Sequence, residues 1–345
     1  MSGSIDPSQG PEITEPKKKG PKVLAVIFVL GMTGFLATLF WINWPKPRMR
    51  PEPLNPAITA AIQRMPGKAD AIIYIGLKEI RGSRFWKESV PDSLKKTRLF
   101  RTSAKLQELL DKNGIDLSKD LDTLLLGFQR SGRKQQKFIG MAWGQFAGKL
   151  PAKTLESASL ESADIAGHRA YALDSNFWVS PLGQGHMALA SSRTMLAGYL
   201  KPAGRLLDRD SVSAALIDKA VYKSHLWFAL SSPLWTVGAL QSLTSGNRDV
   251  KSVGNLNKIQ QLALSIQFGD GLKGQSEWVY KNRRSAFFAS SFLWGTIKLS
   301  SNPGTRTSKH AKAFLKHLGV QQNLESVIIT ADLPMTAFRK VMNRN

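Results

Sequence analysis

The feature that most constrains this chain is an apolar stretch near its start, Val23 to Ile42, which contains no charged residue. Folded as a helix, twenty residues rise about 30 Å, which matches the hydrocarbon thickness of a bilayer. A helix also pairs its own backbone N–H and C=O groups, as lipid requires. The stretch therefore predicts a transmembrane helix over residues 23–44, ended by Pro45 and Pro47.

Two alternatives fit this stretch less well. A cleaved signal peptide has a shorter apolar region and a small-x-small cleavage site, whereas this one ends in Trp-Ile-Asn-Trp-Pro. A buried core helix rarely lacks a polar face over such a length. We therefore favour a permanent anchor.

Basic residues flank the stretch on both sides and bear on its orientation. Four precede it and three follow it, a small excess that favours a cytoplasmic N-terminus, with residues 1–22 as a disordered basic tail. The predicted location is the inner (cytoplasmic) membrane, single-pass, with the C-terminal domain outside the cytoplasm. The residues expected at the membrane interface are Trp41, Trp44, Lys46, Arg48 and Arg50.

The chain is strongly basic, with a formal net charge of +23 at pH 7. Residues 1–51 hold seven Lys or Arg and three Asp or Glu, so +19 of that charge belongs to the remainder. Such a surface attracts polyanions: anionic lipid, an acidic envelope polymer, an acidic protein or nucleic acid. The alternative is a charged surface that serves solubility alone. No cysteine is present, which excludes disulfides and thiol chemistry but fits either side of the membrane.

Hydrophobic periodicity predicts an α+β fold after a Pro-rich linker at residues 45–56. We expect two similar modules, 57–204 and 205–345, each a mostly antiparallel sheet with helices on one face. The run Ala69–Ile80 is typical of a central strand, and Leu121–Phe128 with Lys137–Phe146 predicts a hairpin. A second strand, hairpin and helix set recurs after residue 205. "SKHAKAFLKHLG" predicts a helix ended by Gly319.

One part of the chain resembles a known family. The strand "DAIIYIGL", the following helix and the segment "NGIDLSKDLDTLLLGF" leading into a hairpin are similar to a family of bacterial membrane-anchored envelope proteins of uncharacterised function. The similarity is best over Ala69 to Leu200, and its most specific piece runs from Gly114 to Leu121. The resemblance implies an exported, anchored α+β protein and no catalytic residues.

The sequence predicts no cofactor, metal or catalytic site. Asp116, Asp120 and Asp122 form the one dense carboxylate group, but the glycine and distal glutamate of a calcium loop are missing. We therefore expect Asp116 to cap a turn and the other two to be solvated. No histidine pair has zinc-site spacing, and no nucleophile elbow, Walker A loop or dinucleotide fingerprint occurs. His310 and His317 are expected on one helix, as part of a basic surface stripe.

Three basic clusters are candidates for binding an anionic partner, at the hairpin tip, in "KNRR" and along the helix near residue 310. Their residues are Arg130, Arg133, Lys134, Lys137, Arg283, Arg284, Lys309, Lys312 and Lys316. The adjoining "RRSAFFASSFLWGTIKLSS" predicts a helix with an apolar stripe, which fits either the core or a partner-binding or lipid-contacting face.

These observations leave three hypotheses. The first is a non-catalytic bitopic membrane protein whose basic domain binds or scaffolds a membrane protein assembly or an anionic envelope surface. The second is an anchored enzyme acting on an envelope polymer, with a cleft between the modules. The third, a cytoplasmic nucleic-acid binder, is disfavoured because no recognition motif or stacking pattern is present.

Overall fold

The computed structural model describes residues 21–45, 53–95, 103–131, 135–183, 185–220, 224–233, 235–236, 258–304 and 307–342. The chain forms two compact units, Met1–Trp44 and Pro45–Asn345. Each unit is described separately below.

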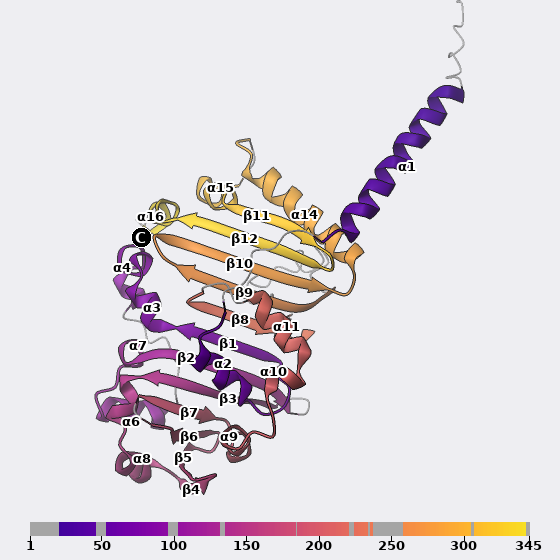
Figure 1. Cartoon of the computed structure of the whole chain (residues 1–345). Coiled ribbons are helices and arrows are strands. Elements are labelled where there is room, and N and C mark those ends of the chain that lie inside the picture. Colours follow the sequence, from indigo (N-terminus) through magenta and orange to yellow (C-terminus); the bar gives the residue numbers. More distant parts are fainter. Residues whose placement is uncertain are drawn as a thin grey trace, which may run out of the picture. The chain divides into compact units, whose positions relative to one another are not determined.

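The first unit contains helix α1, Pro21–Asn43, which covers almost all of the predicted membrane helix (Figure 1). Among the residues that the structure describes, no helix has both the length and the apolar character of a membrane span. The transmembrane assignment stays a prediction. The tail at 1–20 and most of the linker, 46–52, lie outside the described residues.

The second unit is built on one sheet of twelve strands. Its order is β11-β12-β10-β9-β8-β1-β2-β3-β7-β6-β5-β4, and every neighbouring pair is antiparallel. The strands are β1 (Ala71–Gly76), β2 (Leu121–Ser131), β3 (Gln135–Gly144), β4 (Glu161–Ile165), β5 (His168–Asp174), β6 (Phe177–Pro181), β7 (His186–Ala190), β8 (Leu226–Leu230), β9 (Ile259–Phe268), β10 (Gly271–Tyr280), β11 (Leu318–Asn323) and β12 (Ser326–Pro334).

The centre of this sheet is the pairing of β1 with β8. Both strands are short and apolar, and Tyr74 of β1 lies directly opposite Trp227 of β8. Their rings stack with centroids 5.6 Å apart. Outward from this pair the next four strands follow the same order on each side: a hairpin first (β2-β3 or β9-β10), then a second hairpin entered through its later strand (β7-β6 or β12-β11). Strands β5 and β4 extend the sheet on the first side only. The recurring pattern in the sequence therefore corresponds to two halves of one sheet.

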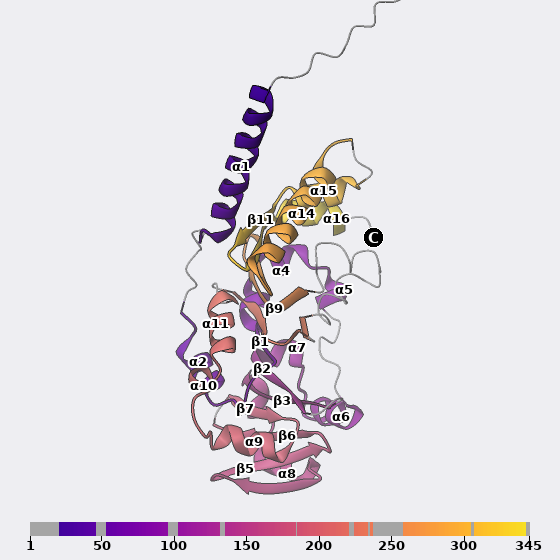
Figure 2. The ribbon, with the colours of Figure 1, turned by 90° about the vertical axis from the view of Figure 1, so that its right-hand side faces the viewer.

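Helices cover both faces of the sheet. Figure 2 shows α2, α10 and α11 on one side and α6 on the other. The helices of the second unit are α2 (Pro56–Gln63), α3 (Leu77–Gly82), α4 (Arg84–Ser89), α5 (Asp92–Lys95), α6 (Ala104–Lys112), α7 (Leu117–Asp120), the 3-10 helix η1 (Gln145–Lys149), α8 (Ala152–Ala158), α9 (Arg193–Leu200), α10 (Leu206–Arg209), α11 (Ser211–Ala220), α14 (Arg283–Ser301), α15 (Lys309–Leu315) and α16 (Met335–Met342).

Alternation along the strands explains why both faces need a cover. Ala170 and Ala172 of β5 belong to one core, whereas Tyr171 and Leu173, between and beyond them, belong to the core on the opposite face. Successive strand residues point to opposite faces of the sheet. A strand that is apolar throughout must therefore be covered on both faces. The expected fold class, α+β with an antiparallel sheet, is confirmed. The expectation of two sheets with helices on one face is wrong.

The largest core joins the two halves of the sheet. Ile72 and Leu125 from the first half lie in the same buried cluster as Trp227 and Ala263 from the second. A second cluster lies under α6, η1 and α8 on the opposite face, and a third lies under α14. Because the first cluster takes apolar residues from both halves, each half depends on the other for burial.

Two strands were missed by the sequence analysis, and they are the two edges of the sheet. No strand was predicted directly after α8, where β4 lies. The helix expected to end at Gly319 ends at Leu315, and Gly319 lies within β11. Edge strands are short and partly polar, so their hydrophobic pattern is weak.

The shared core predicts that neither half folds alone. We expect fragments 57–204 and 205–345, expressed separately, to show no cooperative unfolding transition, because each would expose one strand of the central pair and the part of the largest core that packs against the other half. Fragment 53–345, which holds the whole sheet, serves as the positive control. Thermal unfolding followed by circular dichroism measures this, and a cooperative transition in either half would contradict it.

Candidate functional site

The longest described helix of the second unit, α14, begins at Arg283, within the predicted basic cluster "KNRR". The Asn282 side chain caps it by accepting a hydrogen bond from the Ser285 backbone N–H at 2.9 Å. One face carries small residues, Ala286 and Ala289, which are fully buried against the third core. Small side chains allow the helix to approach β10, β11 and β12 closely. This packing determines which face of α14 is turned outward.

The outward face of α14 carries large apolar side chains. Phe288, Phe292 and Leu299 follow helical spacing on that face and are 56%, 43% and 66% exposed. Trp294, at the side of this stripe, is also exposed. Phe288, Phe292 and Leu299 are called the α14 stripe from here on. Large apolar groups gathered on one exposed surface typically mark an interaction site.

Basic residues lie at both ends of the α14 stripe. Arg284, one turn before Phe288, is exposed, and so is Lys298 in the last turn. Arg283 is about half exposed and faces Glu325 of the β11–β12 turn at 3.8 Å. Of the two arginines predicted here, Arg284 is therefore better placed to meet an external anion.

Helix α15 contacts α14 and carries the second predicted basic cluster. Lys309 is exposed at its first turn, and Lys316, its C-cap, is exposed too. The Lys312 ammonium instead donates to the Pro303 carbonyl oxygen at 2.9 Å. His317 lies beyond the end of α15, so the prediction that it shares this helix with His310 is wrong. Two of the three predicted lysines thus remain directed at solvent.

The third predicted cluster is separate from the first two. Arg130 is exposed near the end of β2, and Lys137, partly exposed, lies near the start of β3. Arg133 and Lys134 lie outside the described residues. The β2 end shares a sheet end with the start of α14, but four strand spacings, roughly 20 Å, separate β2 from β10. The fold therefore brings the α14 and α15 clusters together and leaves the hairpin cluster apart.

The predicted membrane-interface residues are only partly described. Trp41 lies in the last turn of α1 and Trp44 directly after it, and both are exposed. The Trp44 ring stacks on Phe40 with centroids 4.9 Å apart. Lys46, Arg48 and Arg50 lie outside the described residues, so their role at the interface stays a prediction.

The carboxylates of the "DLSKDLD" segment have structural roles. Asp116 caps α7 by accepting a hydrogen bond from the Ser118 N–H at 2.9 Å, as predicted. Asp120 is buried, and its Oδ2 accepts hydrogen bonds from Lys149 Nζ at 2.7 Å and the Asp116 N–H at 2.9 Å.

Asp122 forms a 3.0 Å ion pair with Arg81. The expectation that Asp120 and Asp122 are solvated is therefore wrong, because both carboxylates are paired with cations from other elements. Within the described ranges, no three His, Asp or Glu side chains gather as a metal site would need.

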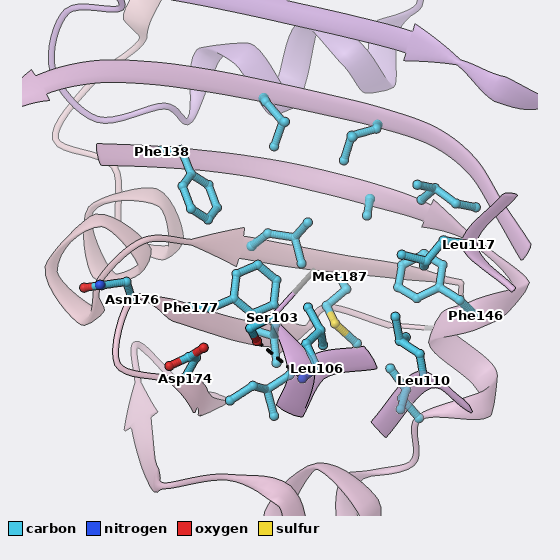
Figure 3. A pocket seen from close by; sticks show the side chains of 18 of the residues that line it. Ser103, Leu106, Leu110, Leu117, Phe138, Phe146, Asp174, Asn176, Phe177 and Met187 are labelled. Atoms are coloured by element: carbon cyan, nitrogen blue, oxygen red, sulfur yellow. Dashed lines mark hydrogen bonds between the residues drawn. The ribbon is translucent and has the colours of Figure 1, made fainter. Parts of the chain in front are cut away.

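An apolar cavity of about 500 Å³ lies between α6 and the sheet (Figure 3). Its walls come from α6, α7, η1 and strands β2, β3, β5, β6 and β7. Hydrophobic periodicity predicts these Leu and Phe positions as parts of strands and helices but predicts no site there. A spacing of two residues along β2, as in Leu124, Leu126 and Phe128, places side chains on one face of a strand.

A second cavity, of about 440 Å³, lies at the junction of the two halves. Tyr74, Glu79, His225 and Gln267 contribute polar groups to it. The Phe268 backbone N–H donates a hydrogen bond to His225 Nδ1 at 3.2 Å. Burial lowers the pKa of His225, and the nearby Glu79 partly offsets this effect. Burial and the hydrogen bond from the Phe268 N–H therefore both favour the neutral form of the His225 imidazole.

The comparisons with known proteins assign no family. No family model matches this chain, and no curated protein matches it. Among solved structures, crystal form I of TP0453 resembles it with a TM-score of 0.43 and 10% sequence identity, over 84% of this chain and 97% of that chain. At this identity and TM-score the likeness indicates no function. The resemblance to an envelope protein family stays a prediction.

The buried Asp120 contact predicts a loss of stability on its removal. Asp120→Ala would leave the Asp116 amide without its acceptor and remove the ion pair with Lys149, whose ammonium keeps the Gly114 carbonyl oxygen at 3.1 Å, so we expect the free energy of unfolding to fall by about 1–3 kcal/mol. Urea unfolding measures this. The control is Glu108→Ala, which removes an exposed ion pair with Lys112 and should change little. Equal effects of the two substitutions would contradict the assignment.

The neutral state of His225 predicts an acid-sensitive fold. Because its pKa is lowered in the folded state, the unfolded chain binds a proton that the folded chain does not. Stability is therefore expected to fall as the pH drops below about 6.5, the ordinary pKa of histidine. His225→Asn retains an acceptor for the Phe268 amide but cannot titrate. Unfolding midpoints at pH 7.5 and 5.5 should differ less in this variant than in the native chain; an equal difference would contradict the prediction.

Proposed function

We propose that this chain is a non-catalytic, membrane-tethered envelope protein whose basic domain binds an anionic bilayer surface through α14. The observation that carries the proposal is the exposed α14 stripe with basic residues at both ends. A helix with an apolar stripe flanked by Arg and Lys is the pattern of segments that lie in the headgroup layer. The buried face of α14 holds it on the sheet, so the stripe needs no refolding to reach a membrane.

Electrostatics supports an anionic surface as the partner. The residues after position 51 carry +19 of the net charge. Near anionic lipid each Lys or Arg contributes about 1 kcal/mol to binding, within a Debye length of the surface. Arg284, Lys298, Lys309 and Lys316 are the exposed cations on α14 and α15 identified above. They can act together with the apolar contact.

The uncharged stretch Val23–Ile42 supports the tethering part of the proposal. A membrane anchor confines the domain next to a bilayer, which raises the effective concentration for a weak surface contact. The proposed location is the inner membrane, with the domain on its extracytoplasmic side. A basic surface held there also suits a scaffold for a membrane assembly. The domain would serve this second role once it is docked on the bilayer.

The anchored-enzyme hypothesis has less support. Its cleft would be the cavity between the two halves, where His225 is the natural candidate base. The His225 Nδ1 accepts a hydrogen bond from the Phe268 backbone N–H, so this nitrogen is not available to take a proton from a substrate. We therefore do not propose a reaction at this junction.

Vesicle binding by fragment 53–345 tests the docking surface without the apolar N-terminal stretch. We expect co-sedimentation with vesicles of phosphatidylglycerol and phosphatidylcholine, and little with phosphatidylcholine alone. Arg284→Gln with Lys298→Gln should weaken binding by about 30-fold, since two charges of about 1 kcal/mol each are lost. Phe288→Ser with Phe292→Ser should weaken it too, through loss of apolar burial.

The matched control is Leu160→Ser, because Leu160 is 64% exposed and follows α8, away from α14. This variant should bind like the native fragment, and added salt should weaken binding in every case. Unchanged binding by both α14 variants would contradict docking through this helix. Absence of binding to any vesicle would favour a protein partner instead.

A further inference from the structure

The cavity beneath α6 has the size and lining of a ligand site. Its volume of about 500 Å³ falls in the range of small-molecule pockets, about 300–1,000 Å³. Four of the lining residues are polar, and the other sixteen are apolar. Its floor is the second core, in which Leu124, Val179 and Met187 are buried. This floor gives the cavity a firm, preformed wall.

The polar lining residues lie together at one end of the cavity. Figure 3 shows Asp174 and Asn176 at one end, with Leu110, Leu117 and Phe146 at the other. Ser103 and Ser175 complete the polar group. The cavity thus offers a polar rim and an apolar interior, which is the polarity profile of an amphiphile.

The rim groups also limit which amphiphile fits. Ser103 is the N-cap of α6 and accepts a hydrogen bond from the Leu106 N–H, and Asp174 Oδ1 accepts one from the Ser175 N–H at 2.7 Å. That amide lowers the pKa of Asp174, which is therefore ionised at neutral pH. A carboxylate at the rim disfavours a second anion there, because like charges repel, and solvent and the nearby Lys105 ammonium weaken this repulsion.

Water is a poor occupant of the interior. A buried water needs two to four polar partners, and the inner part of this cavity is lined by hydrocarbon and aromatic side chains. An apolar ligand would remove this surface from solvent and contribute about 25 cal/mol for each Å² buried. The apolar interior therefore favours a hydrocarbon chain over solvent.

We propose that this cavity binds the single hydrocarbon chain of an amphiphile with an uncharged polar head. The chain lies beneath α6 with its end toward Phe146 and Leu110, and the head lies at Asp174 and Asn176. This site does not depend on docking through α14, although a nearby bilayer would supply such amphiphiles.

Photocrosslinking of the full chain, reconstituted into phosphatidylcholine vesicles, tests the site. The probe is a monoacylglycerol with a diazirine at the end of its chain, followed by mass spectrometry of the labelled peptides. We expect labelling in α6, in η1 and in the segment around Leu117. A free fatty acid with the same diazirine should label these peptides less, because its carboxylate meets Asp174.

Two substitutions on α6 form a matched pair. Leu106→Trp fills the cavity from a lining position and should reduce labelling about tenfold, whereas Glu108→Trp places the same side chain at an exposed position and should leave labelling unchanged. Circular dichroism of both variants verifies that α6 and the sheet are intact. Phe288→Ser with Phe292→Ser should not alter labelling, which separates this site from the α14 surface.

Three outcomes would overturn the proposal. Labelling confined to α1 or to α14 would show that the probe marks only membrane-contacting segments. Equal labelling of the Leu106→Trp and Glu108→Trp variants would place the probe outside the cavity. Equal labelling by the monoacylglycerol and the free fatty acid would contradict the uncharged head that the proposal assigns to the ligand.

Discussion

The pairing of β1 with β8 is the contact on which the rest of the fold depends. It joins two strand sets of matching order into one sheet, and the Tyr74–Trp227 stack lies at its centre. The largest core continues across this line, with Ile72 and Ala263 contributed from opposite sides. Without the pairing, each half would have an open edge of unpaired backbone groups and a core half exposed to water.

A sheet of twelve strands that is apolar on both faces needs helices on both sides, and this requirement generates the two candidate sites. On the outer strands of the second half, α14 uses small residues to pack and leaves Phe288, Phe292 and Leu299 outside. On the first half, α6 covers the second core incompletely and leaves the 500 Å³ cavity over strands β2, β3, β7, β6 and β5. Both sites are places where the cover of the sheet leaves apolar surface accessible.

The two sites are complementary in chemistry. The α14 surface combines aromatic groups with cations, which suits anionic headgroups, whereas the cavity has an apolar interior and an anionic rim, which suits an uncharged amphiphile. A tethered domain with both sites would contact anionic headgroups through α14 and bind one hydrocarbon chain in the cavity. The Asp120–Lys149 ion pair joins α7 to η1 beside the cavity and so supports its wall.

The sequence by itself determined most of the interior elements, because local hydrophobic patterns specify them. The central strand, both long hairpins and the Asp116 cap follow from residue spacing and turn chemistry. The edge strands β4 and β11 could not be recognised in this way, since their stability comes from a neighbouring strand and not from their own pattern. Only the tertiary structure decided that two similar strand sets share one sheet, that Lys312 folds back on Pro303, and which face of α14 is exposed. These contacts join residues that are far apart in the chain. Residue spacing specifies local structure only, so it does not predict which distant surface a residue will contact.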